Sequence, residues 1–329
     1  MKSKNKIIQI GKFVLATIVS LGILNVFVQF YSFSGVHITN KAHATDYTWE
    51  SKQIKRTLDE GFAYVQMDEL GYNNSKVLTS IDYLIMGSSN VEAVNVETND
   101  NFVSLLNNEF QNINFYNIGI SGHQIYNCVN NLESAIETFS PKQAIILVTD
   151  SVELDNESMK EVIDGKWKRI PSYDTGMLFY IQKKAPVIKT LYKKVLDWKD
   201  LDVVDVDTND IDFSSNEYLT NLQEFLSFAK KNVGDIDLII VYQPSTKIDS
   251  SGELIEAQDP YALEIFEETC KNNNIKFVDM TDDFKKLYED EHILAHGFIN
   301  TAAGTGHLNR YGHQVIARRL SKLIKEEIG

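Results

Sequence analysis

The sequence predicts an α/β domain in which a five-stranded parallel sheet lies between layers of helices, preceded by one membrane-spanning helix. Short apolar stretches of strand length alternate with amphipathic stretches of helix length, the pattern of repeated β-α-β units. The stretch 144–149 is apolar throughout, as expected for a central strand covered on both faces. A long uncharged stretch lies close to the N-terminus. These three observations set the fold class.

Composition excludes several classes of protein. Hydrophobic residues make up 43% and charged residues 24% of the 329 residues, as in a chain that forms a core. The formal net charge is −14, and nucleic-acid binding calls for a cationic surface. Two cysteines cannot supply a disulfide framework or a cysteine zinc site.

The N-terminal 34 residues predict a signal anchor. Four lysines precede the stretch 13–33, which has no charged residue and is long enough to cross a hydrocarbon core of roughly 30 Å as a helix. Lysines stay on the cytoplasmic side, so the rest of the chain is expected outside the cell membrane. Without these four lysines the formal net charge changes from −14 to −18.

A cleaved signal peptide is the alternative for this segment. Ala42-His43-Ala44 has the small-x-small form that a signal peptidase accepts. The site lies about ten residues beyond the apolar stretch, which is farther than usual. We therefore favour an uncleaved, single-pass anchor.

Residues 35–78 are expected to form a stalk with a helical stretch, because Trp49, Ile54, Leu58 and Phe62 follow near-helical spacing.

Residues 79–329 carry the alternating pattern of the main domain. The expected strands are 81–86, 113–117, 144–149, 237–242 and 275–279. The expected helices are 99–110, 123–137, 260–272 and 310–327.

An insertion at about 152–234 interrupts this rhythm. It holds two expected helices, 177–198 and 217–231, around the acidic stretch 199–212. That stretch lacks the glycine and the final glutamate of an EF-hand loop, so we interpret it as a solvated linker.

Polar residues gather where the predicted strands end. Gly87-Ser88-Ser89-Asn90, Gly119-Ile120-Ser121-Gly122-His123 and Asp150-Ser151 each follow a strand, and Gly306-His307 precedes the last helix. Ligands of parallel sheets bind beyond the carboxyl ends of the strands. Serine, histidine and backbone N–H donors there suit acyl transfer.

The order and form of these blocks resemble the SGNH, or GDSL-type, hydrolases and acyltransferases. The family's Gly-Asp-Ser resembles Gly87-Ser88-Ser89, which makes Ser89 the expected nucleophile. The Asn-x-Gly-x-Ser-Gly block matches 117–122 throughout and implies an oxyanion N–H from Gly122. The resemblance also implies a three-layer, flavodoxin-like sheet.

Two blocks depart from the family pattern. Asp150 or Ser151 stands where the oxyanion asparagine is usual, and we assign Ser151 to that neighbourhood. The last block keeps His307 as the base but has Gly304 in place of the aspartate that orients it. The nearest upstream acids, Asp282 and Asp283, suit helix capping. We therefore expect a carbonyl or water to accept the Nδ1 proton, and Gly304→Asp to raise activity.

The resemblance implies an extracytoplasmic serine esterase or O-acyltransferase that acts on acylated glycans or polysaccharide of the cell envelope. It implies no metal and no organic cofactor, and a possible multi-span membrane acyltransferase as partner. The alternative is an inactive SGNH scaffold that binds a glycan or such a partner. Ser89 could equally cap a helix, Gly122 allow close packing, and His307 cap the last helix.

Overall fold

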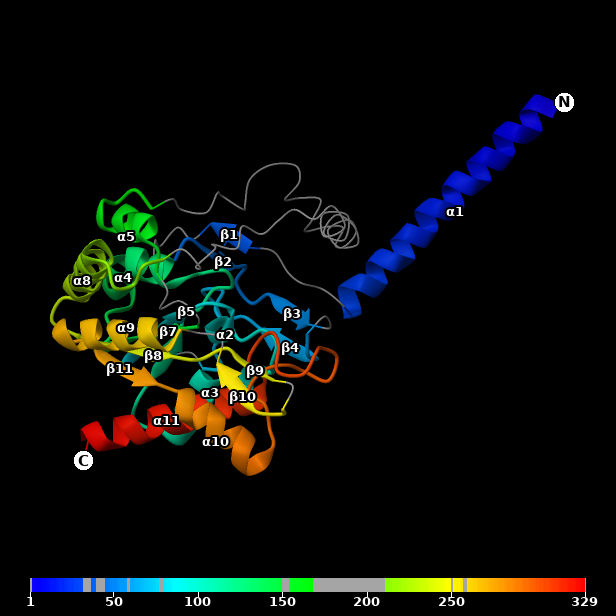
Figure 1. Cartoon of the computed structure of the whole chain (residues 1–329). Helices are drawn as coiled ribbons and strands as arrows, with labels where there is room; N and C mark the ends of the chain where they lie inside the picture. The colour runs from blue at the N-terminus through cyan, green and yellow to red at the C-terminus, as the bar shows by residue number, and fades with distance from the viewer. Residues whose placement is uncertain are drawn as a thin grey trace.

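The structure is a computed structural model that describes residues 2–31, 37–39, 45–57, 60–76, 78, 80–149, 154–167, 211–249, 251–256 and 259–328. Its centre is a parallel sheet of five strands in the order β11-β8-β7-β5-β6 (Figure 1). The strands are β5 (Tyr83–Gly87), β6 (Phe115–Asn117), β7 (Gln143–Val148), β8 (Asp237–Tyr242) and β11 (Lys276–Asp279). The predicted five-stranded parallel sheet is confirmed, with boundaries within two residues.

Helices cover both faces of the sheet. One face carries α4 (Ile125–Phe139), α5 (Asn156–Ile163), α8 (Asn216–Asn232) and α9 (Pro260–Asn272). The other carries α3 (Phe102–Glu109), α10 (Thr281–Glu291) and α11 (Arg310–Ile328).

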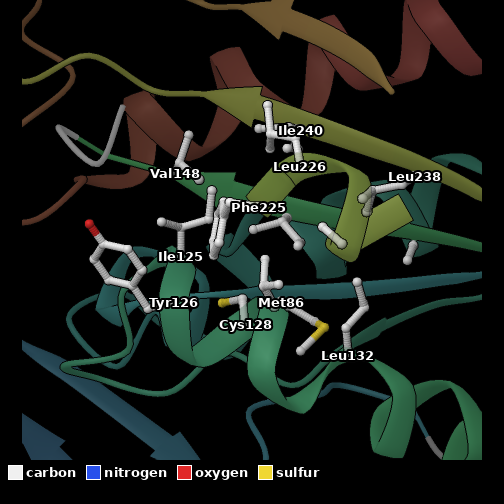
Figure 2. Close-up of a cluster of buried hydrophobic side chains, with 14 of the residues drawn as sticks. Met86, Ile125, Tyr126, Cys128, Leu132, Val148, Phe225, Leu226, Leu238 and Ile240 are labelled. Atoms are coloured by element: carbon white, nitrogen blue, oxygen red, sulfur yellow. The ribbon is translucent and has the colours of Figure 1, made fainter. Parts of the chain in front are cut away.

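Alternating residues of the strands feed the two apolar layers. In β5, Leu84 and Met86 pack against α4 and α8, while Tyr83 and Ile85 pack toward α3 and α11. Figure 2 shows the first layer, where Met86 lies close to Cys128 of α4. Cys128 is buried within this layer.

The expected helices of the main domain are present, and the described residues hold three further α-helices that the sequence analysis does not predict. These are the short helix α2 (Ser89–Glu92), α5 and α10. The helix expected at 177–198 lies outside the described residues, as does most of the acidic stretch 199–212.

The N-terminal helix α1 (Lys2–Tyr31) stands apart from the domain in Figure 1. Its segment Lys6–Phe27 has a mean hydropathy of 2.1, and none of its residues is buried within the protein. It is long and apolar enough to span a membrane, as the sequence predicts.

The expected helix after the anchor is wrong, because this part of the chain forms strands. β1 (His37–Thr39) pairs with β2 (Tyr47–Trp49), and β3 (Ile54–Thr57) pairs with β4 (Ala63–Gln66) in an antiparallel hairpin. Burial alternates along β4, with Ala63 and Val65 inward, which is a strand pattern that the helical spacing of more distant residues concealed. Leu58 lies outside the described residues.

This segment packs on the main domain. Trp49, Ala63, Val65 and Met67 form a small apolar cluster with Val94, which follows the first strand-end block. The segment therefore lies against the edge of the sheet where the chemistry is expected.

Candidate active site

Ser89 lies at the carboxyl end of the central strand β5. The strand ends at Gly87, Ser88 takes the N-cap position, and Ser89 opens the short helix α2 (Ser89–Glu92). The Ser88 side chain makes no capping hydrogen bond. Ser89 is half-buried, and as the first helical residue its N–H has no partner within the helix.

The second block packs against the Ser89 turn. The Ile120 N–H donates to the Gly87 carbonyl at 3.0 Å. A Cβ at Gly119 would lie 2.5 Å from the Val91 Cβ, so only glycine allows this approach of the loop to α2. Gly122 follows with φ of +83° and is exposed. Within the described part of the chain its N–H donates no hydrogen bond, which leaves it available to an oxyanion.

His307 lies in the loop that precedes α11, beside the Ser89 turn. The Leu308 N–H donates to Asn90 Oδ1 at 3.1 Å, so the residues that follow the expected base and nucleophile are joined directly. Among the described residues no hydrogen bond joins Ser89 Oγ to the His307 ring. The pairing of Ser89 with His307 therefore stays a prediction, now supported by the link between their turns.

A carboxylate from the N-terminal segment contacts the His307 ring. Glu60 Oε2 lies 2.5 Å from His307 Nδ1, and Glu60 Oε1 accepts the backbone N–H of His307. The expectation that a carbonyl or water accepts the Nδ1 proton is therefore wrong. Asp283 is the partner of Arg319 instead, with 3.7 Å between Oδ2 and Nε, and Asp282 lies in the first turn of α10.

A second carboxylate, that of the buried Glu92, holds the loop that carries Gly122, which we call the oxyanion loop. Trp49 Nε1 donates to Glu92 Oε1 at 2.6 Å, and Ser121 Oγ donates to Glu92 Oε2. Tyr47 Oη donates to the Ser121 carbonyl at 2.5 Å. Ser121 precedes Gly122, so these contacts from β2 and α2 fix the backbone that presents the Gly122 N–H.

A group of buried polar side chains joins the Ser89 turn to the ends of the neighbouring strands. Gln243, at the end of β8, accepts from Asn90 Nδ2 at 2.8 Å and contacts His296 Nε2 at 2.6 Å. Thr149 Oγ1 donates to the same Gln243 oxygen at 3.0 Å. Burial lowers the pKa of His296 to about 4, so its ring is neutral at pH 7 and can accept a hydrogen bond from Gln243.

The remaining candidate residues fall into two groups. Ser151 and Asp150 lie outside the described residues, so the assigned third-block donor stays a prediction. His313 is buried and stacks on Phe102, which is a structural role. Across the described ranges, no group of three His, Cys, Asp or Glu side chains is arranged to hold a metal ion.

Sequence reasoning missed Glu60, Glu92 and Gln243. Glu60 and Gln243 are far in sequence from the blocks that they serve, and nothing in their local pattern distinguishes them. Sequence reasoning could have found Glu92, because it lies three residues after Ser89, and a glutamate at the end of that turn faces the neighbouring strand end.

One groove of the described surface lies away from this site. It has a volume of about 500 Å³ between α3 and α11 and is lined by Glu109, Arg318 and Lys325, among others. This part of α11 lies near the amino ends of the strands, since Glu327 contacts both Tyr83 and Lys276. Ligands of parallel sheets bind at the opposite edge.

Comparison with known proteins finds likeness in solved structures. No family model matches the chain, and no curated protein sequence matches it. A member of the lipolytic G-D-S-L family from Veillonella parvula matches at 16% identity and a TM-score of 0.39, over 75% of this chain and 99% of that one. The esterase EstA from Pseudoalteromonas matches at 15% and 0.39, over 76% and 99%.

A catalytic mutant of Axe2, an acetylxylan esterase from Geobacillus stearothermophilus, matches at 14% identity and a TM-score of 0.40, over 75% of this chain and 95% of that one. Identities and TM-scores this low do not establish a shared activity, and the functional conclusions below rest on this chain's own residues. The Veillonella parvula protein is named as a member of the G-D-S-L family, which is the family that the sequence blocks resemble.

Proposed function

We propose that the protein is a serine esterase or O-acyltransferase with Ser89 as nucleophile and His307 as general base. The observation that carries this proposal is the joining of the two turns by the bond from Leu308 to Asn90 at the carboxyl edge of the sheet. The exposed N–H of Gly122 completes the set of groups that acyl transfer requires.

The reaction follows from these positions. His307 Nδ1 is engaged by Glu60, so the Nε2 atom is the one left to take the proton of the Ser89 hydroxyl. Ser89 Oγ then attacks the ester carbonyl, and the N–H groups of Ser89 and Gly122 bind the oxyanion. The alcohol leaves with the proton from His307. Water or a sugar hydroxyl next attacks the acyl-serine, with His307 acting as base again.

The substrate class and the location belong to the same proposal. An apolar N-terminal helix that can span a membrane supports a cell-membrane protein whose domain faces outward. Acyl groups on cell-envelope glycans are substrates that such a domain can reach. A membrane acyltransferase that supplies the acyl group would favour transfer over hydrolysis.

Labelling with a fluorophosphonate tests the nucleophile. The full chain in detergent should be labelled, Ser89→Ala should abolish labelling, and Ser88→Ala should only weaken it. Labelling that survives Ser89→Ala but not Ser88→Ala would move the nucleophile by one residue. A folded chain that is not labelled at all would leave the inactive, glycan-binding scaffold.

A further inference from the structure

Both oxygens of the Glu60 carboxylate contact the same residue, His307. Oε2 meets His307 Nδ1 at 2.5 Å and Oε1 accepts the His307 backbone N–H. The side chain of Glu60 is 19% exposed, and that of His307 is 34% exposed. A carboxylate held in this way fixes both the plane of the imidazole ring and the tautomer that carries its proton on Nδ1.

The loop before His307 leaves room for this carboxylate. Gly306 has φ of +87°, and a Cβ there would lie 2.0 Å from Glu60 Oε1. Any other residue at 306 would displace the Glu60 side chain. Gly304, which stands where the resemblance expects an acid, also has a left-handed backbone. The absence of a side chain at Gly306 therefore makes room for the Glu60 carboxylate beside His307.

Glu60 is delivered by a segment that also contacts the other catalytic loops. This segment, residues 45–67, is here called the N-terminal clamp. Trp49 donates to Glu92, and the Thr57 hydroxyl donates to the Val94 carbonyl at 2.7 Å. The Gly61 N–H donates to Asn300 Oδ1 at 2.9 Å, in the loop that leads to His307. The clamp therefore joins the α2 turn to the His307 loop.

We infer that Glu60 is the positioning residue of the proposed catalytic pair, and that the active site is complete only when the N-terminal clamp is docked on the sheet edge. The inference rests on the proposed function, because it concerns the same histidine. A negative carboxylate at Nδ1 stabilises the imidazolium that forms when His307 takes the Ser89 proton. The acid thus comes from the segment that follows the apolar helix and precedes the main domain.

Glu60→Gln tests the inference in the full chain, with Glu69→Gln as matched control. Glu69 lies in the same region but forms an exposed pair with Lys52. Glu60→Gln should lower kcat for an aryl acetate by about 10²- to 10⁴-fold with a small change in KM. It should also abolish the strongly downfield proton resonance of a histidine–carboxylate hydrogen bond. Glu60→Asp should recover part of the activity, and Glu69→Gln should match the wild type.

Two results separate the possible failures. If the wild type neither hydrolyses esters nor reacts with a fluorophosphonate but shows the downfield proton, the contact is real and the proposed function is wrong. If the wild type is active and Glu60→Gln retains more than half of kcat with an unchanged pH–rate profile, Glu60 does not position His307.

A second inference rests on a different observation, the exposure of two large apolar side chains beside this pair. Ile299 is 94% exposed and Phe62 is 63% exposed. Each is next in sequence to one partner of the Gly61–Asn300 hydrogen bond, so the two side chains belong to adjoining loops. Phe62 lies two residues after Glu60. We call these two side chains the apolar patch.

The tether limits what can cover the apolar patch. Seventeen residues separate the end of the candidate span at Phe27 from Thr45, a reach of at most about 60 Å when fully extended. The domain of an anchored chain therefore stays close to the bilayer. We propose that the apolar patch enters the bilayer interface, so that the catalytic edge works at the membrane surface. Phenylalanine and isoleucine gain by leaving water there.

Spin labels on the full chain in phosphatidylcholine nanodiscs test this placement. The native Cys128 and Cys270 are buried, so single introduced cysteines report alone. A label at Ile299→Cys should be reached by oxygen more readily than by a water-soluble nickel chelate. A label at the exposed Ile328→Cys should show the reverse order.

Leu15→Cys, in α1, is the control for anchoring and should report lipid. If it does and the label at residue 299 behaves like that at residue 328, the patch does not enter the bilayer. A label at residue 299 that is immobile yet reached by neither reagent would indicate a protein partner and overturn the lipid proposal. If the label at residue 15 reports water, the anchor itself is wrong.

Discussion

The sheet edge that carries the proposed catalytic residues is built by two regions that are held in place in different ways. The turns that carry Ser89 and His307 continue from elements packed in the two large apolar layers of the sheet. The N-terminal clamp has one small apolar cluster, and it reaches the site through hydrogen bonds from side chains such as Trp49 and Glu60.

This difference separates two kinds of contribution to catalysis. Burial of the strand ends fixes where the reacting groups are, and loss of a reacting group removes the chemistry. Contacts from the clamp fix how those groups are oriented, and their loss leaves the groups present but misaligned. Changes to the reacting groups on the turns with Ser89 and His307 should therefore abolish activity. Changes to the contacts of the N-terminal clamp should only reduce it.

The largest effect is expected for His307→Ala, in the region whose turns continue from the packed layers of the sheet. Turnover of an aryl acetate should fall by roughly 10⁴-fold or more, because His307 is the base of the proposed mechanism. His292→Ala is the matched control, since this histidine is exposed on the far end of α10. Steady-state kinetics at pH 7.5, about one unit above the ordinary histidine pKa, measure both. Equal losses in the two variants would remove His307 from the site.

Acid should destabilise both regions through buried histidines. Burial lowers the pKa of His123, beside Asp46 of the clamp, to about 4, and that of His313, in the first turn of α11, to about 3. The unfolded chain binds these protons below about pH 6.5 and the folded chain does not. Stability is therefore complete above pH 6.5 and is lost as the pH falls toward 4, by about 3 kcal/mol per histidine.

Denaturant titrations between pH 7.5 and 4.5 measure this loss. His123→Gln and His313→Gln should each flatten the dependence of the unfolding free energy on pH, whatever their effect at pH 7.5. His292→Gln, at an exposed position, should leave the slope unchanged. A slope that neither buried variant alters would show that other groups take up the protons.

Glu92→Gln probes the contact of the clamp with the oxyanion loop and should have a moderate effect. An amide keeps one acceptor but cannot accept from both Trp49 Nε1 and Ser121 Oγ. Turnover should fall about tenfold as the Gly122 N–H shifts, with KM nearly constant. Glu97→Gln is the control, since the Glu97 carboxylate accepts an exposed N–H, that of Tyr64. A fall of 10⁴-fold would assign Glu92 a direct role in the reaction.

The same comparison explains what the sequence predicts well. The sheet, its helices and the strand-end turns with Ser89, Gly122 and His307 follow from local periodicity and short blocks. The place of Glu60 in the site depends on a contact across 247 residues, between Glu60 and His307, which no local pattern encodes. Four apolar residues at helical spacing predict a helix here and conceal the short alternation of β4. The same wrong interpretation conceals Glu60, the carboxylate that takes the place of the missing aspartate.

The smallest effect is expected for Gly304→Asp, which the sequence alone suggests should restore a missing group. In the structure His307 Nδ1 already has Glu60 as its partner. A side chain at Gly304 would start 3.6 Å from Leu294 Cδ1, and the backbone there has φ of +73°. Aspartate tolerates this conformation at a cost of roughly 1 kcal/mol. Turnover should change by less than about twofold, and the melting temperature should fall slightly. The same substitution in a Glu60→Gln background should not restore activity, because the atoms nearest to a Cβ at residue 304 belong to Leu294 and Thr246 and not to His307. Recovery there would show that the His307 loop can adopt the arrangement with its own acid, and that the N-terminal clamp is dispensable for orienting the base.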